Sequence, residues 1–145
     1  MNPHILSGGL ATDDRGTLRF ANDFDLSQYK RFYIISNHQQ GFVRAWHGHK
    51  QEAKAFMVTQ GAAIVAAVKI DDWDNPDATT EVTRAVLAGD KPSLFIIPPG
   101  FANGSMSLTA DASILVFSSL PLTDAAGDDF RFPARLWDVW HIEER

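Results

Sequence analysis

Residues Gly41–Gly61 read GFVRAWHGHKQEAKAFMVTQG and place two histidines, His47 and His49, inside a frame of two glycines. Five residues separate Gly41 from His47, four separate His49 from Lys54, and six separate Lys54 from Gly61. Side chains two residues apart on a β-strand point to the same face. We therefore expect His47 and His49 to face one cavity, such as the interior of a β-barrel.

This spacing resembles the first motif of the cupin family, and Pro98, Gly100 and Asn103 stand at the spacing of the second. Lys54 occupies the position of the acidic metal ligand, and Asn103 occupies that of the last histidine ligand. An ammonium group repels a divalent ion, which carboxylates or neutral imidazoles would bind. The resemblance implies a pocket in which acid/base chemistry has replaced a metal centre. We predict no metal and no organic cofactor.

Composition limits the classes of protein to which the chain can belong. With 145 residues, 45% of them apolar, we expect one domain, residues 1–145, with its own core. A net charge of −5 argues against a nucleic-acid binder, and the absence of cysteine excludes disulfides and zinc–thiolate sites. No signal peptide and no apolar run of about 18 residues is evident. The expectation is a soluble, cytoplasmic protein without a membrane partner.

Short β-branched and aromatic runs alternate with turn residues about every ten residues, as in an all-β sandwich or barrel. With the motif spacing, this predicts a cupin-type jelly roll. One helical turn is expected near Leu26–Tyr29, and the tail Phe130–Arg145 is expected to pack across the barrel mouth or against a second subunit. The expected strands are Arg31–Ser36, Phe42–His47, Lys54–Thr59, Ala62–Ile70, Thr80–Leu87, Leu94–Ile97 and Ile114–Ser118.

Lys54 and the two histidines form the predicted catalytic centre. A lysine is costly to bury unless it meets an anion, and it would suit an enolate that develops on a bound carbonyl compound. A histidine has the right pKa range to remove a proton near neutral pH. Arg15 and Arg44 are candidates for a diphosphate, because a guanidinium presents a planar fork of donors. The alternatives are structural histidines and solvated surface cations.

Four elements resemble, in this order, the motifs of the dTDP-4-dehydrorhamnose 3,5-epimerase family: Asp14-Arg15-Gly16, Arg44–His47, Lys54 and Ile97–Gly104. The stretch RAWHGHK, Arg44–Lys50, is similar to the RGXHAHK element of nucleotide-sugar 3,4-ketoisomerases. The chain thus lies between two neighbouring activities on one jelly-roll scaffold.

The resemblance implies His47 as the base, Lys54 beside the enolate, and Arg44 and Arg15 on the diphosphate. It places an acidic partner of the base near the chain end, where Asp138 in LWDVW is the candidate. It also implies a homodimer that pairs or exchanges N-terminal strands.

The chain departs from the epimerase pattern at the residue that acts as the proton-donating acid. The epimerases use a tyrosine acid in the last barrel strand, but Ala112–Ser119 contains none, and Phe117 cannot donate a proton. Tyr29 and Tyr33 are the only tyrosines, and no motif ties Tyr33 to the pocket. This argues against epimerisation at two carbons.

The sequence therefore predicts an isomerase or epimerase that acts on a nucleotide-diphosphate sugar with a 4-keto group. His47 would remove the proton at C3, with C5 as the alternative, and His49 or His47 would pass a proton in a ketoisomerisation. Asn103, Trp46 and Phe101 are candidate substrate contacts, the two aromatic residues either stacking on the base or belonging to the core. The competing interpretations are a 3,4-ketoisomerase, a non-catalytic sugar-binding cupin and a metal-dependent cupin enzyme.

Overall fold

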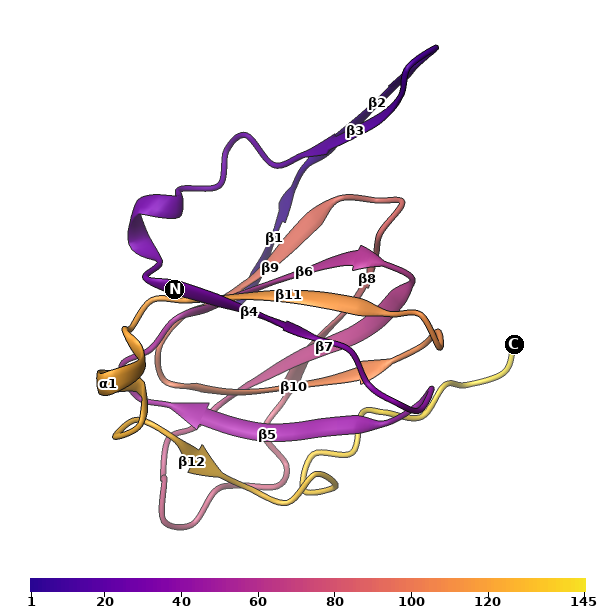
Figure 1. Ribbon diagram of the computed structural model, residues 1–145. Coiled ribbons are helices and arrows are strands. Elements are labelled where there is room, and N and C mark those ends of the chain that lie inside the picture. Colours follow the sequence, from indigo (N-terminus) through magenta and orange to yellow (C-terminus); the bar gives the residue numbers. More distant parts are fainter.

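Two five-stranded antiparallel sheets pack face to face in the computed structural model, which describes residues 1–145 (Figure 1). Sheet 1 has the order β1 (His4–Ser7), β9 (Ser93–Ile97), β6 (Lys54–Gln60), β11 (Ser113–Ser118) and β4 (Arg31–Ile35). Sheet 2 has the order β12 (Phe130–Arg131), β5 (Val43–His49), β10 (Phe101–Ser107), β7 (Ala62–Lys69) and β8 (Val82–Ala88). From β4 onward the chain passes back and forth between the sheets, as in a jelly roll. The all-β, cupin-type fold is confirmed.

The seven expected strands all form, with ends that differ by one or two residues. The expected helical turn is the 3₁₀ helix Leu26–Gln28, where the Asp25 side chain accepts a hydrogen bond from the Ser27 amide. The strand β10 was missed. It reads FANGSMS, which lacks the alternation of a half-buried strand, and all seven residues are buried. The other unexpected elements are β1, β2 (Gly9–Asp13), β3 (Gly16–Phe20), β12 and the short helix α1 (Leu122–Ala125).

The apolar residues form two cores, one on each side of sheet 2. The inner core lies between the sheets and includes Phe56, Phe95 and Ile114. The outer core covers the other face of sheet 2, where Trp46 packs against Trp137 and Trp140 of the tail. The outer core consists of Trp46, Ile64, Ala66, Val68, Ile70, Ala102, Met106, Trp137 and Trp140.

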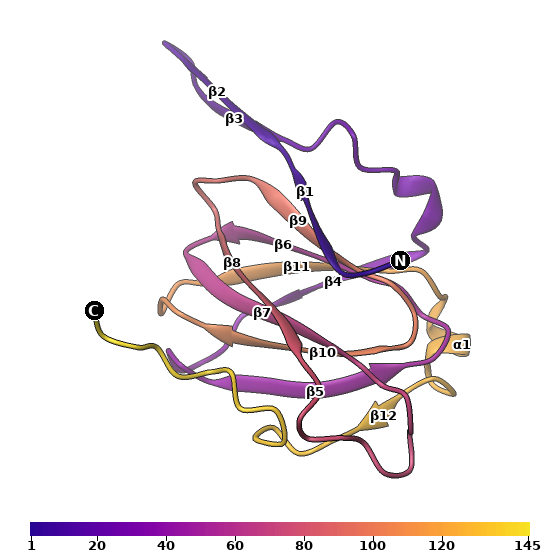
Figure 2. The same ribbon diagram turned by 180° about the vertical axis from the view of Figure 1, so that it is seen from behind.

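The sequence suggested that the tail crosses the barrel mouth, but it does not. It runs along the outside of the barrel beside β5 (Figure 2). Gly104 makes this packing possible, because a Cβ atom there would lie 2.9 Å from the Trp140 ring and 2.6 Å from the Ala45 Cβ atom.

A hairpin of β2 (Gly9–Asp13) and β3 (Gly16–Phe20) projects away from both sheets (Figures 1 and 2). Leu10 and Leu18 of this hairpin are 45% and 66% exposed.

No helix in the structure is both long enough and apolar enough to span a membrane.

Candidate active site

A β-bulge in β5 brings Arg44 and His47 to the same face of sheet 2. In the pairing of β5 with β10, Asn103 is opposite His47 and Gly104 is opposite Ala45, so Trp46 has no partner on β10. An extra residue of this kind shifts the alternation of side chains along a strand. Arg44, His47 and His49 therefore line one cavity, while Trp46 points to the outer core.

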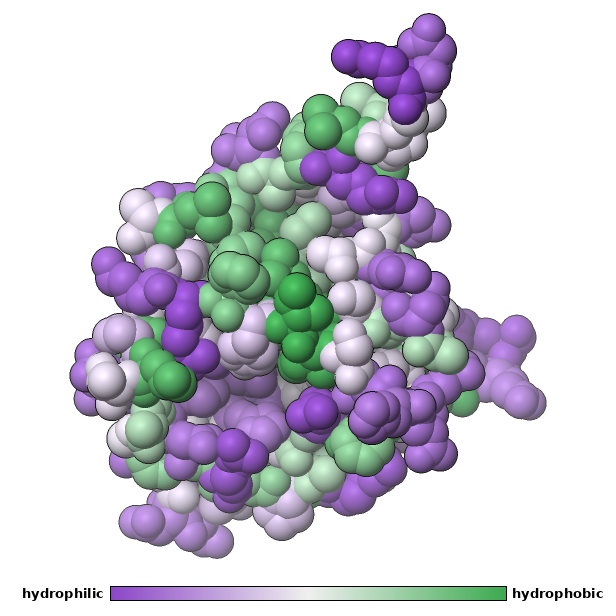
Figure 3. Space-filling model, viewed as in Figure 1, coloured by the Kyte–Doolittle hydropathy of each residue, from purple (hydrophilic) through white to green (hydrophobic).

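The cavity has a volume of about 480 Å³ and opens between the two sheets. Side chains from both sheets contribute, and α1 closes one side. In the space-filling view, apolar side chains gather on the front of the barrel above a recessed hydrophilic area (Figure 3). The polar lining residues are Arg31, Tyr33, Ser36, Arg44, His47, His49, Glu52, Lys54, Asn103, Ser105, Asp129 and Arg131.

Lys54 lies at the floor of this cavity and is only 4% exposed. Its Nζ donates hydrogen bonds to the Ser118 Oγ at 2.6 Å and to the Tyr33 hydroxyl at 3.2 Å. The Glu52 Oε1 lies 3.5 Å from Nζ. Burial lowers the pKa of Lys54, and the nearby Glu52 carboxylate opposes this effect. Lys54 is thus a buried cation beside a cavity, as the motif predicted.

Tyr33, which no sequence motif tied to the pocket, lines it from β4. Its backbone pairs with Val116 of β11, the strand in which the family resemblance places a tyrosine acid. Because its hydroxyl oxygen accepts the hydrogen bond from Lys54, the hydroxyl proton stays free to be donated. Burial raises the pKa of Tyr33 to about 12, so the phenol keeps its proton at neutral pH.

The two histidines have different surroundings. Burial, followed by the positive charge of Arg131, lowers the pKa of His47 to about 4, so its imidazole is neutral at pH 7. Burial also lowers the pKa of His49, but the hydrogen bond to the Asp128 carbonyl opposes this effect. The His49 Nδ1 lies 2.7 Å from that carbonyl oxygen. A carbonyl oxygen only accepts, so Nδ1 carries the proton and Nε2 keeps its lone pair.

Glu52 and Asp128 were missed by the sequence analysis, although Glu52 lies within the opening stretch. The Asp128 carboxylate accepts hydrogen bonds from the backbone amides of Lys50, Gln51 and Glu52, at 2.8, 3.0 and 2.9 Å. It thereby fixes the loop between β5 and β6. Glu52 is 2% exposed and its Oε1 pairs with Arg31 at 3.2 Å.

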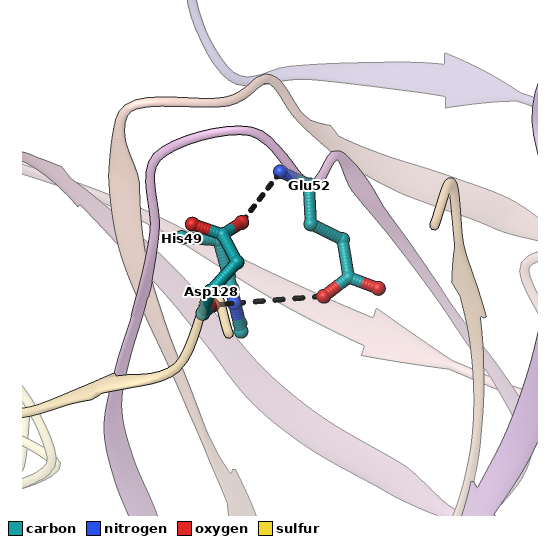
Figure 4. A group of neighbouring side chains, drawn as sticks. All are labelled: His49, Glu52 and Asp128. Carbon is teal, nitrogen blue, oxygen red and sulfur yellow. Dashed lines mark hydrogen bonds and ion pairs between the residues drawn. The ribbon is translucent and has the colours of Figure 1, made fainter. Parts of the chain in front are cut away.

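His49, Glu52 and Asp128 lie close enough together to suggest metal ligands (Figure 4). Most of their donor atoms are already engaged, however: the Asp128 carboxylate by three amides, the Glu52 Oε1 by two cations, and the His49 Nδ1 by a carbonyl. Only the Glu52 Oε2 and the His49 Nε2 are left, and two donors are too few to hold an ion. A divalent ion here would displace these contacts and lie close to the Lys54 ammonium. The donor set therefore does not fit a metal.

Polar groups at the upper wall are suited to an anionic or hydroxylated ligand. Arg44 is exposed, and its Nε donates to the Asn37 side chain at 2.7 Å. Arg131 pairs with Asp129 through two hydrogen bonds of 2.8 and 2.9 Å. Asn103 is buried, lines the cavity, and its Nδ2 has no hydrogen-bond partner. An unsatisfied buried donor at a cavity wall is a natural contact for a ligand oxygen.

One family model matches most of the chain. The model of the family described as "FdtA: WxcM-like, C-terminal" matches residues 1–126. The chain belongs to this family. Among functionally curated proteins, none is similar enough in sequence to match this chain.

Solved structures similar to this member of the FdtA, WxcM-like family share its fold at low sequence identity. The dTDP-4-dehydrorhamnose 3,5-epimerase of Bacillus anthracis, with TDP and pyrophosphate bound, has a TM-score of 0.78 and 18% identity; the match covers 98% of this chain and 86% of that one. The sugar 3,4-ketoisomerase QdtA of Thermoanaerobacterium thermosaccharolyticum, in complex with TDP, has a TM-score of 0.68 and 21% identity, with coverages of 96% and 94%. The resemblance inferred from the motifs is confirmed at the level of family and fold.

Four of the expected site residues lie outside the cavity of this FdtA-like chain. Asp138 is wrong as the acidic partner, because it is exposed on the tail and pairs with Arg135 at 3.0 Å. Trp46 is wrong as a substrate contact, because it is fully buried in the outer core. Phe101 belongs to the inner core. Arg15 lies in the turn between β2 and β3, at the tip of the projecting hairpin, where it pairs with Asp13.

The low pKa of His47 predicts a stability that falls in acid. The folded protein holds His47 neutral down to about pH 4, whereas the unfolded chain protonates it below its usual 6.5. The unfolded state therefore binds more protons in this interval, and the free energy of unfolding should drop between pH 6.5 and 4, by about 2 kcal/mol. Urea denaturation at pH 7 and pH 4.5 measures this drop, and His47→Asn should reduce it. An equal drop in both proteins would contradict the assignment.

Proposed function

We propose that this protein is a cytoplasmic isomerase or epimerase that acts on a nucleotide-linked 4-keto sugar, in the synthesis of sugars for surface polysaccharides. The observation that carries the proposal is the convergence of a neutral histidine, a buried lysine and a protonated tyrosine on one cavity. Membership of the FdtA, WxcM-like family and the TDP bound to structural neighbours support it.

In this reaction His47 removes the proton next to the ketone, and negative charge moves to the ketone oxygen. The Lys54 Nζ and the Tyr33 hydroxyl are 3.2 Å apart, so one substrate oxygen can contact both. Such fixed donors stabilise an oxyanion far more than water does. His47 lies on sheet 2 and Tyr33 on sheet 1, on facing walls of the cavity. When Lys54 alone holds the oxygen, the single Tyr33 proton can instead be returned to the carbon from the face opposite His47, which inverts the carbon.

The charged end of the substrate would lie at the rim. Arg44 and Arg131 line the cavity and are exposed to solvent, which suits the recognition of a diphosphate. The free Nδ2 of Asn103 would donate to a sugar hydroxyl. These contacts position the sugar above Lys54.

A second candidate is 3,4-ketoisomerisation, in which the carbonyl moves from C4 to C3. It is favoured by the RAWHGHK stretch and by His49, whose Nε2 is free to accept a proton. A sugar-binding protein without turnover is the third candidate.

Proton NMR in D2O distinguishes these candidates, with a dTDP-4-keto-6-deoxyhexose as the first substrate and GDP- and UDP-linked analogues after it. Epimerisation incorporates deuterium at C3 or C5 and gives a new epimer. Ketoisomerisation moves the carbonyl to C3. Binding of every substrate without exchange at any carbon would contradict both enzymatic proposals.

We also propose a homodimer, because the β2–β3 hairpin leaves the barrel with Leu10 and Leu18 exposed. The strand β4 is an edge of sheet 1, and its Phe32 and Ile34 are 64% and 60% exposed. An apolar hairpin from a second copy would cover this edge and carry its Arg15 toward the cavity. Sedimentation should give twice the mass of one chain, and Leu18→Asp should give the mass of one. A wild-type protein that sediments as a single chain would contradict this proposal.

A further inference from the structure

A fully buried carboxylate lies beneath the catalytic cavity. Glu52 comes from the loop between β5 and β6, and its side chain has no exposed surface. Its Oε1 lies 3.2 Å from the Arg31 Nη2 and 3.5 Å from the Lys54 Nζ. Carboxylates are rarely buried without partners, because the loss of hydration must be offset. These two cations account for one of its oxygens.

The other oxygen, Oε2, is buried and has no hydrogen-bond partner. The His49 imidazole lies beside Oε2, with its Nδ1 3.6 Å away (Figure 4). Because Nδ1 donates to the Asp128 carbonyl, Nε2 is the nitrogen that can take up a proton. A proton on Nε2 would turn the ring into a cation directly beside the free carboxylate oxygen.

His47 has no comparable partner. No ion pair or hydrogen bond is made by its ring. Arg131, His49 and Lys54 disfavour a positive charge on it, and only Asp129, which is itself paired with Arg131, favours one. Of the charged groups around His49, Lys54 opposes an imidazolium, whereas Glu52 and Asp128 favour it. The two histidines therefore differ in their ability to hold a proton once they have accepted it.

We propose that Glu52 is a positioning residue that fixes the His49 ring and stabilises its protonated form, which makes His49 a second proton carrier beside His47. This inference rests on the proposed isomerase function, and it favours ketoisomerisation. In that reaction His47 moves the carbon-bound proton from C3 to C4, and His49 moves the hydroxyl proton from O3 to O4. Each histidine ends in its starting form, so protons and charge balance.

The Glu52–His49 pair can be tested without any substrate by ¹⁵N NMR of the histidines in the whole protein. We expect the wild-type His49 ring to carry its proton on Nδ1. In Glu52→Gln we expect the midpoint of His49 titration to fall by about one pH unit, a tenfold weaker hold on the proton. Ser118→Ala is the matched control, since it removes a Lys54 contact but leaves Glu52 and His49 in place.

Several outcomes would overturn the inference. One is a wild-type ring protonated on Nε2, a result that needs no variant. Another is an unchanged His49 midpoint in Glu52→Gln, or an equal fall in Ser118→Ala. If Glu52→Gln does not fold, Glu52→Asp keeps the charge farther from the ring, and a smaller fall in the midpoint is expected; no fall would overturn the inference.

Turnover supplies the second readout. With a substrate identified, Glu52→Gln should lower kcat about 100-fold and leave the Kd for TDP unchanged, because the diphosphate contacts lie elsewhere. Equal loss of TDP binding would show a merely structural role and overturn the inference. A wild-type protein that turns over no keto sugar would contradict the proposed function, while the NMR titration would still decide whether Glu52 controls His49.

Discussion

Replacing His47 by asparagine is expected to lower kcat for solvent exchange at the sugar carbon by about 10³-fold, within the range by which general bases accelerate proton transfer. His47 is neutral at pH 7 because burial and Arg131 lower its pKa to about 4, so it is ready to accept a proton. Asparagine has a similar shape but cannot take up a proton in this pH range. The measurement is the rate of deuterium incorporation in D2O with a 4-keto sugar nucleotide.

The control for this prediction is His141→Asn, which changes an exposed histidine of the tail that does not line the cavity. It should exchange at the wild-type rate. The Kd of His47→Asn for TDP should stay within about threefold of wild type, because His47 is not expected to contact the diphosphate. If His47→Asn still exchanged at more than about a tenth of the wild-type rate, another group would be the base.

The motif predicted His47, His49 and Lys54 correctly as neighbours on one cavity, because strand alternation and residue spacing are local properties. Arg44 is a different case. Simple alternation would place it on the face opposite His47, and only the bulge at Trp46 turns it inward. A bulge depends on the pairing partner, so the sequence of one strand does not reveal it.

Tyr33 and Glu52 were missed because long-range pairing brings them to the site. Tyr33 reaches Lys54 only because β4 and β6 both pair with β11. Glu52 is buried because Asp128, 76 residues later in the chain, binds three amides of its loop. The sequence did carry part of the evidence for Glu52: it lies two residues before Lys54, and a nearby carboxylate is a candidate partner for a buried lysine.

The tryptophans of the tail predicted correctly that it is ordered, but the place predicted for it, across the barrel mouth, was wrong. The strand β10 explains the difference, because its small residues leave room on the outer face of sheet 2. A tryptophan can cover such a surface, and Trp140 does so over Gly104. The apolar content of the tail thus serves the outer core and leaves the cavity open.

Replacing Trp46 by alanine is expected to lower the free energy of unfolding by about 3–5 kcal/mol, the usual cost of truncating a buried aromatic side chain. Trp46 is fully buried, and its ring centroid lies 5.4 Å from that of Trp137 and 5.2 Å from that of Trp140. Denaturation in urea at low temperature measures this loss.

The half-buried Trp73, which packs against Phe130 and Phe132, provides a matched comparison for Trp46. Trp73→Ala should cost about half as much, because less of its surface leaves water on folding. The sequence suggested that Trp46 contacts the substrate, whereas its place in the outer core predicts that folded Trp46→Ala binds TDP as wild type does. A weakened Kd together with an unchanged free energy of unfolding would restore Trp46 as a ligand contact and contradict its structural role.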